Sequence, residues 1–139
     1  MNRVFQHAAT PLEQGTTVIA ASAGTGKTFT IAALVVRLVA ELGIPIHRLL
    51  LTTYTVAATA ELRDRIRARL ISAHEALKSD GPPEDEFLRE LLPRLPAESA
   101  QRLATAIRDF DEANVHTIHA FCQRALREQA FETGAPFQI

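Results

Sequence analysis

The chain is short of several features that assign a protein to a functional class. Its single cysteine, Cys122, excludes an intrachain disulfide and a metal site built from paired cysteines. No apolar stretch approaches the roughly 18 residues of a membrane-spanning helix, and the N-terminus has no apolar run of signal-peptide length. The formal net charge of −1 gives no overall attraction to nucleic acid or to a membrane surface. We therefore expect a soluble, cytoplasmic protein with no membrane partner.

Lysine is scarce as well, and its position is informative. Thirteen of the fifteen basic residues are arginine, and Lys27 and Lys78 are the only lysines. Lys27 ends a loop close to the pattern G-x-x-x-x-G-K-S/T, whose backbone N–H groups, lysine and hydroxyl bind phosphates and Mg²⁺. Gly26, Lys27 and Thr28 supply the end of the pattern, and Ala21 replaces its first glycine, which a negative φ tolerates. The loop predicts binding of ATP and Mg²⁺; a glycine-bearing turn without a ligand is the alternative.

The apolar patterns predict an α/β fold with a parallel sheet flanked by helices. Residues 17–21 and 114–118 are expected to be short strands. Residues 49–55 are expected to be a strand whose apolar start is typical of the interior of a parallel sheet. We expect helices at residues 27–42, 57–77, 84–92, 97–110 and 117–131. Residues at about 79–112 then form a helical insert between the second and third strands.

Further stretches resemble motifs of a known family. Residues 53–63, TYTVAATAELR, resemble motif Ia of UvrD/Rep-type superfamily-one DNA helicases, and residues 117–124, TIHAFCQR, resemble its motif Ib. Residues 11–15, PLEQG, lie where that family has an adenine-contacting glutamine, here Gln14. Together with ASAGTGKTFTIAAL, these stretches are similar to the N-terminal part of RecB-like subunits, the beta chain of exodeoxyribonuclease V. Tyr54 departs from the usual phenylalanine but keeps an aromatic face.

This resemblance implies a partial P-loop NTPase (RecA-like) domain, with residues 1–139 as the N-terminal part of the first helicase ATP-binding domain. The parent protein would be an ATP-dependent DNA helicase and exonuclease subunit in recombinational double-strand break repair. The implied partners are DNA, along a single-stranded path and at duplex ends, and the other subunits of a RecBCD-like complex. As a fragment without Walker B acids, the chain is expected to be catalytically incomplete and to self-associate through unpaired sheet edges.

The resemblance also implies roles for individual residues. Lys27 is implied to hold the β/γ-phosphates and Thr28 to bind Mg²⁺, which makes them the catalytic pair of this segment. The residues expected to bind the nucleotide are Gln14, Ala21, Ser22, Ala23, Gly24, Thr25, Gly26, Lys27, Thr28 and Phe29.

Motifs Ia and Ib are implied to line the single-stranded DNA path, which agrees with their chemistry. Threonine hydroxyls bond phosphate or sugar without reading sequence, and planar rings stack on any base. The alternative for Tyr54 and Phe121 is that they fill core around the strand ends. The residues expected to contact DNA are Thr53, Tyr54, Thr55, Thr117, His119 and Phe121.

Other polar residues are interpreted as structural. The arginine series Arg63, Arg65, Arg67 and Arg69 is interpreted as a solvated helix face paired with acids such as Asp64, rather than as a DNA contact. His116 is interpreted as structural and Cys122 as a small core residue. The Asp111–Glu112 pair has the composition of a Walker B pair, but it precedes the apolar strand residues instead of following them. We therefore expect it at a helix-to-strand junction.

Three other functions stay open. A compact P-loop kinase or other small NTPase would use Asp111 and Glu112 as its acidic pair and would turn over ATP without responding to DNA. A non-catalytic nucleotide-binding module would bind without turnover. A fragment of an AddA-type helicase-nuclease would share most of the same motifs.

Overall fold

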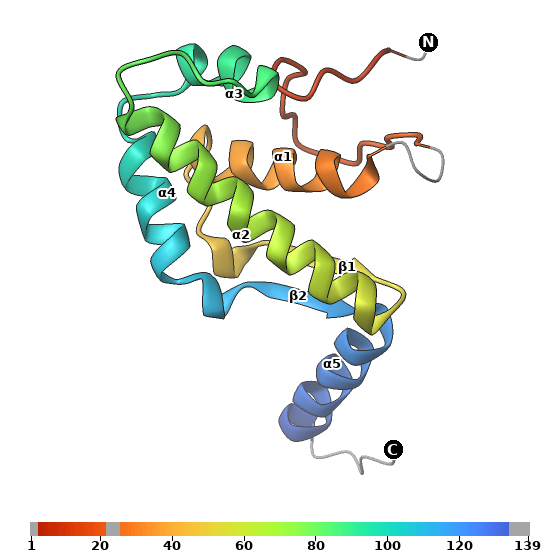
Figure 1. Ribbon diagram of the computed structural model, residues 1–139. Helices are drawn as coiled ribbons and strands as arrows, with labels where there is room; N and C mark the ends of the chain where they lie inside the picture. The colour runs from red at the N-terminus through yellow and green to blue at the C-terminus, as the bar shows by residue number, and fades with distance from the viewer. Residues whose placement is uncertain (1–2, 22–25, 134–139) are drawn as a thin grey trace.

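A computed structural model of the chain describes residues 3–21 and 26–133. Within these residues it is an α/β structure with a two-stranded sheet, as Figure 1 shows, and the predicted fold class is confirmed. The main elements are α1 (Lys27–Ala40), β1 (Leu50–Thr53), α2 (Val56–Lys78), α3 (Glu86–Leu91), α4 (Ser99–Arg108), β2 (Asn114–Thr117) and α5 (Ile118–Thr133). Short 3-10 turns lie at η1 (Ile46–Arg48), η2 (Leu92–Arg94) and η3 (Phe110–Glu112).

The two strands are parallel neighbours. Leu50 pairs with Asn114 and Thr53 with Thr117, so both strands end at the same edge of the sheet. Parallel neighbours require a long crossover connection, which α2, α3 and α4 provide here. The chain leaves β1 into α2 and β2 into α5 at this shared edge, so two strand-to-helix turns lie side by side (Figure 1).

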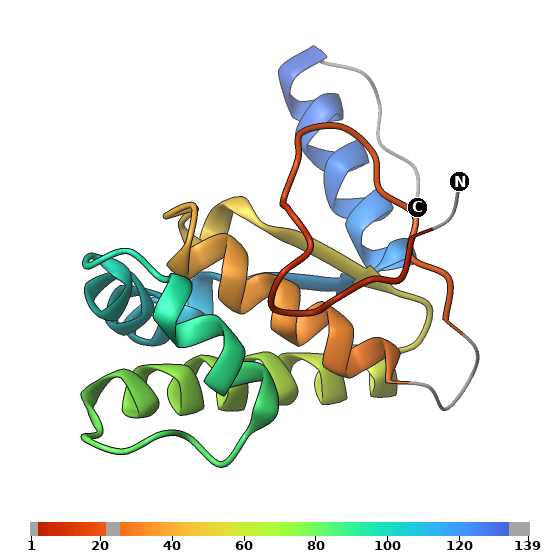
Figure 2. The ribbon, with the colours of Figure 1, turned by 90° about the horizontal axis from the view of Figure 1, so that it is seen from above.

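The core lies around α2. This helix packs against α1, α4 and both strands, and Figure 2 shows α1 running beside it. Leu62, Ile66, Leu70 and Ala73 recur at helical spacing and are all buried, as predicted. Helix α1 is buried along most of its length because α2 and α4 both contact it, which suits its largely apolar sequence. The two helices that carry the functional motifs are therefore held in one packed unit.

The C-terminal end of α1 is closed by side chains of α4. Ser99 Oγ donates to the Ala40 carbonyl at 2.8 Å, and Arg102 Nη1 donates to the Ala40 and Glu41 carbonyls at 3.0 and 3.1 Å. Gly43 follows with φ at +68°, where a Cβ would come within 3.0 Å of the Arg102 guanidinium. The insert thus supplies hydrogen bonds that the last turn of α1 cannot make for itself.

A buried arginine attaches the N-terminal segment to α1. Arg37 donates to the His7 carbonyl at 3.2 Å and to the Thr10 carbonyl at 2.7 Å, and its charge is balanced by Glu41 at 2.7 Å. The His7 ring nitrogen Nε2 lies 2.9 Å from Thr30 Oγ1. The backbone that precedes Gln14 is therefore fixed against α1.

Two expectations about strands are wrong. Residues 17–21 form no strand, and Val18 is 88% exposed. A strand needs a hydrogen-bonded neighbour, and neither described strand pairs with this segment. Leu50 was expected inside a covered sheet, yet it is 50% exposed because α5 covers only part of that face. None of the helices in the described ranges is long and apolar enough to cross a membrane.

Replacing Leu70 by alanine is expected to lower the free energy of unfolding by about 3 kcal/mol, because burial in a packed core makes the loss of a leucine costly. Chemical denaturation of the 139-residue chain measures this value. Arg67→Ala, at an exposed position of the same helix, is the matched control and should change it by less than about 0.5 kcal/mol. Equal stability of the two variants would contradict the assigned core.

Candidate functional site

The N-terminus of α1 has the properties of an anion site. Gly26 is its N-cap, with φ at +84°, and it offers no side chain to bond the first N–H groups of the helix. The first turn contains no acidic residue, and Lys27 forms no hydrogen bond or ion pair with residues 3–21 and 26–133. Uncapped N–H groups, the helix dipole and an ammonium group together attract phosphate. These residues fit a nucleotide phosphate tail.

The nucleotide-binding residues predicted from sequence fall into two groups. Ser22, Ala23, Gly24 and Thr25 lie outside the described residues. Ala21 is described and does not have a positive φ, which meets the condition for replacing the first glycine. The remaining predicted residues are described: Gln14, Gly26, Lys27 and Phe29 are exposed and Thr28 is half-buried.

Phe29, in the first turn of α1, lies between two pockets. One, of about 490 Å³, opens between the N-terminal segment and α3; the other, of about 450 Å³, opens between α1 and α2. The first is lined by Gln6, His7, Ala8, Ala9, Phe29, Asp85, Glu86, Phe87, Glu90 and Arg94. The second is lined by Gly26, Thr28, Phe29, Ala32, Glu61, Arg65, Ala68, Arg69 and Ser72.

An arginine links the rings beside these pockets. The Arg69 Cζ atom lies 4.7 Å from the Phe29 ring centroid and 5.2 Å from that of Phe87, within cation–π range. Its Nη1 atom lies 2.6 Å from Asp85 Oδ2. Burial raises the pKa of Asp85, but hydrogen bonds from Arg69 and from the Leu88 N–H outweigh it and hold that pKa below its ordinary value of 3.8. The carboxylate is therefore charged at neutral pH.

A second polar surface lies at the edge where both strands end. Tyr54 is 90% exposed, and His119 is exposed as well. Thr55 Oγ1 accepts from the Ala58 N–H at 3.0 Å, and Thr117 Oγ1 accepts from the Ala120 N–H at 3.1 Å, so both hydroxyls stabilise the helix starts that follow the strands. The edge thus presents hydroxyls and an aromatic face, next to the N-termini of α2 and α5.

Comparison with known proteins identifies the family. All of residues 1–139 match the UvrD/REP helicase N-terminal domain. The chain belongs to this family.

Relatives within the family carry two kinds of name. RecBCD enzyme subunit RecB of Escherichia coli (strain K12) is 46% identical over 136 residues, which cover 90% of this chain and 11% of that protein. The protein of the same name from Mycobacterium tuberculosis (strain ATCC 25618 / H37Rv) is 45% identical over 120 residues, 84% of this chain and 11% of that protein. An ATP-dependent helicase/nuclease subunit of Pelotomaculum thermopropionicum (strain DSM 13744 / JCM 10971 / SI) is 33% identical over 122 residues, 86% of this chain and 8% of that protein.

These comparisons confirm the resemblance to RecB-like subunits that motifs Ia and Ib carry. The chain spans about a tenth of the length of the RecB proteins that it matches.

Within this helicase-family segment, the DNA-contact candidates do not all lie together. Thr53 belongs to the shared edge: its Oγ1 lies 2.6 Å from Thr59 Oγ1. Tyr54 is far too exposed to fill the core, so that alternative is wrong for it. Phe121 is half-buried and lines a separate cavity of about 330 Å³ between α5 and the sheet, together with Leu50 and His116. Its role as a base-stacking residue is therefore less supported than that of Tyr54.

His116 lies beside that cavity. Its Nε2 atom is buried and has no hydrogen-bond partner among the described residues. The cavity that His116 lines is large enough for water, the usual partner of such an atom in proteins. The structural interpretation of His116 thus agrees with its half-buried position in β2.

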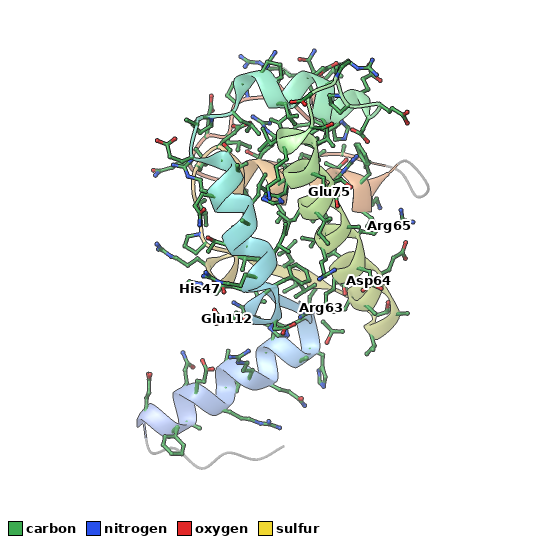
Figure 3. The ribbon with its side chains drawn as sticks, turned by 60° about the vertical axis from the view of Figure 1, so that its left-hand side comes forward. His47, Arg63, Asp64, Arg65, Glu75 and Glu112 are labelled. Atoms are coloured by element: carbon green, nitrogen blue, oxygen red, sulfur yellow. The ribbon has the colours of Figure 1, made fainter. Side chains whose placement is uncertain are left out.

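The interpretation of the arginine series is wrong for half of its members. Arg63 Nη2 donates to the carbonyls of Ala113 and Val115 at 3.2 and 3.4 Å, and Arg69 is only 14% exposed in its side chain. Residues two apart point to nearly opposite sides of a helix, so the run cannot form one face, and Arg63 and Arg69 are the two that border the buried stripe of α2 on either side. Arg65 is exposed as predicted, and its acidic partner is Glu61 at 3.9 Å. Figure 3 shows Arg63 and Arg65 pointing apart.

Cys122 was expected in the core but is exposed. The reason is that α5 leaves the sheet edge and projects from the other helices, as Figures 1 and 2 show, so little covers its outer side.

The position predicted for Asp111 and Glu112 is confirmed. Both belong to η3, immediately before β2, and Glu112 lies 3.9 Å from His47 Nδ1. Figure 3 shows His47 and Glu112 together. In Figure 1, β2 begins on the left, whereas α1 begins on the right, so this end of β2 is far from the start of α1. The pair therefore does not face the phosphate site. Among the described residues no cluster of three or more His, Cys, Asp or Glu side chains is arranged to hold a metal ion.

Sequence reasoning missed Arg69, Asp85 and His7 as residues around Phe29. Asp85 caps α3 by accepting from the Leu88 N–H at 3.0 Å, which its place before an apolar run could have indicated. The contact of Arg69 with Phe29 had no sequence signal, because it joins residues far apart in the chain.

Replacing Gly26 by alanine is expected to lower the free energy of unfolding by about 1–2 kcal/mol, because a left-handed φ strains any residue with a Cβ. A Cβ there would meet no atom nearer than 3.7 Å, so the cost comes from the backbone. Gly81→Ala is the matched control, since Gly81 has open space and no positive φ, and it should be neutral or slightly stabilising. Thermal unfolding compares the two; a Gly26→Ala chain as stable as Gly81→Ala would refute the assigned strain.

Proposed function

We propose that this chain is the ATP-binding and single-stranded-DNA-contacting segment of an ATP-dependent DNA helicase and exonuclease subunit. The observation that supports it most is the uncapped start of α1, where Gly26 and Lys27 offer N–H groups and an ammonium to phosphate. The exposed edge at Tyr54 supports the DNA part of the proposal. The two surfaces belong to one packed unit because α1 and α2 are in contact.

On the nucleotide side, each residue has a distinct task. The N–H groups of the first turn of α1 donate to phosphate oxygens, and Lys27 neutralises their charge at the β/γ-phosphates. The Thr28 hydroxyl is the ligand for Mg²⁺, and Gln14 contacts the adenine. When bound, ATP supplies the free energy of phosphoryl transfer to water.

On the DNA side, the proposed contacts carry no sequence information. Tyr54 and His119 offer ring faces for bases, and the hydroxyls of Thr53, Thr55 and Thr117 reach phosphate or sugar. None of the proposed contact residues is lysine or arginine, and the interaction therefore depends on stacking and hydrogen bonds more than on counterion release. Such a surface suits a motor that must move along any sequence.

For the parent protein we propose recombinational double-strand break repair, with DNA ends as substrate and the other subunits of a RecBCD-like complex as partners. The names of the relatives support this, since those called RecBCD enzyme subunit RecB reach 46% identity. An AddA-type parent is less favoured because the relatives called ATP-dependent helicase/nuclease subunits reach 33%. A compact kinase is disfavoured by the position of Asp111 and Glu112 at the wrong end of β2.

Replacing Lys27 by alanine is expected to weaken the binding of Mg²⁺-ATP to the 139-residue chain at least about tenfold, because charged hydrogen bonds to phosphate are strong. Calorimetric titration measures this, with Lys78→Ala, the other lysine, as the matched control. Unchanged binding by Lys27→Ala would contradict the site. Binding without turnover agrees with an incomplete acidic set, whereas Lys27-dependent turnover indifferent to single-stranded DNA would favour the compact NTPase.

Replacing Tyr54 by alanine is expected to weaken the binding of a thymidine oligonucleotide to the chain by about 5- to 150-fold, because stacking on one base contributes roughly 1–3 kcal/mol. Fluorescence anisotropy at fixed salt measures this. Phe131→Ala removes an equally exposed ring at the far end of α5 and should leave the affinity unchanged. Equal losses in both variants would mean that the strand edge is no specific DNA surface.

A further inference from the structure

The first turn of α1 cannot be stabilised in the usual way. An N-cap side chain or an acidic residue normally bonds the first N–H groups of a helix. Here Gly26 has no side chain, and the first turn contains no acid. Either device would occupy the donors that a phosphate needs. The turn must therefore be held from the side, by contacts that leave its N–H groups accessible.

Phe29 is the side chain that makes these contacts. It follows Thr28 directly, and its ring meets His7 edge-on at 5.1 Å and Phe87 edge-on at 6.2 Å between centroids. His7 in turn lies 2.9 Å from Thr30 Oγ1. The first turn is thus bordered by the N-terminal segment on one side and by α3 on the other.

Arg69 joins these contacts into one cluster. Its guanidinium lies over both the Phe29 and the Phe87 ring, at 4.7 and 5.2 Å, and pairs with Asp85 at 2.6 Å. The side chain is mostly buried, so water screens this pair less than a surface ion pair. Asp85 is also the N-cap of α3, which fixes the carboxylate that holds the arginine.

We propose that Arg69 is a positioning residue for the nucleotide site: held by Asp85 and stacked over Phe29 and Phe87, it fixes the first turn of α1 and so increases the affinity of that turn for nucleotide phosphates. This inference rests on the proposed function. It also couples the helical insert to the site, because a displacement of α3 moves Asp85 and Phe87 and releases Phe29.

Arg69→Lys tests the proposal. Lysine keeps the charge beside Asp85 but loses the planar group that covers two rings. Mg²⁺-ATP affinity should fall about fivefold, the equivalent of roughly 1 kcal/mol, in titrations at a temperature where every variant is fully folded. Arg67→Lys, at an exposed position of the same helix, is the matched control and should bind as the unmodified chain does.

Hydrogen exchange gives a readout that a general loss of stability would not produce. The Thr30 N–H donates to the Gly26 carbonyl at 2.9 Å and reports on closure of the first turn. Its exchange should accelerate in Arg69→Lys without nucleotide, while the amide of Val36, in the buried middle of α1, keeps its rate. Equal acceleration at both amides would indicate destabilisation of the whole chain and would overturn the proposal.

Asp85→Asn provides a second variant if Arg69→Lys fails to fold. Asparagine keeps the N-cap of α3 but removes the charge that holds Arg69, so nucleotide affinity should fall in the same direction. Nucleotide binding by Arg69→Lys or Asp85→Asn at full affinity, while Lys27→Ala has lost it, would overturn the role of Arg69 and leave the proposed function intact. Absence of binding by the unmodified chain would instead overturn the proposed function itself.

Discussion

The first N–H groups of α1 have no side-chain cap, and much of the structure compensates for this missing cap. Gly26 adopts the left-handed backbone conformation at which the helix begins, but it has no side chain to cap the first N–H groups. The opposite end of α1 is closed by Ser99 and Arg102 from α4, and Arg37 in the last turn fixes the same end to the N-terminal segment. A helix with one open end is therefore held at its other end and along its sides. Such preorganisation lets a ligand bind without ordering the helix first.

Parallel pairing determines where the second surface lies. Because β1 and β2 run in the same direction, their ends share one edge, and each is followed by a helix start capped by a threonine hydroxyl. The turn after β1 carries Tyr54 outward because both of its neighbours are bound locally, Thr53 to Thr59 and Thr55 to Ala58. The exposure of the ring thus follows from the hydrogen bonds of the threonines around it.

The parts of the fold that the sequence predicted are those with local causes. The apolar period fixed α2, glycine and proline ended α1, and the order of acidic and apolar residues located Asp111 and Glu112 before β2. Residues 17–21 have the composition of a strand, but pairing depends on a neighbour and not on composition. The exposure of Cys122 depends in the same way on which elements cover α5. Within the candidate site, the loop pattern indicated Lys27. Arg69 was recognised only in the structure, where this α2 residue contacts Phe29 of α1 and Phe87 of α3.

Helix α2 relates the two surfaces physically. Its first residue, Val56, lies beside Tyr54, and Arg69 lies about 20 Å further along the same continuous helix at a rise of about 1.5 Å per residue. Its buried side contacts α1, α4 and both strands, so the segment between these points cannot bend without disturbing the core. The strand edge and Arg69 are therefore held at a fixed separation by the helix that carries both. The packing that stabilises the core thus also sets the distance between the two surfaces.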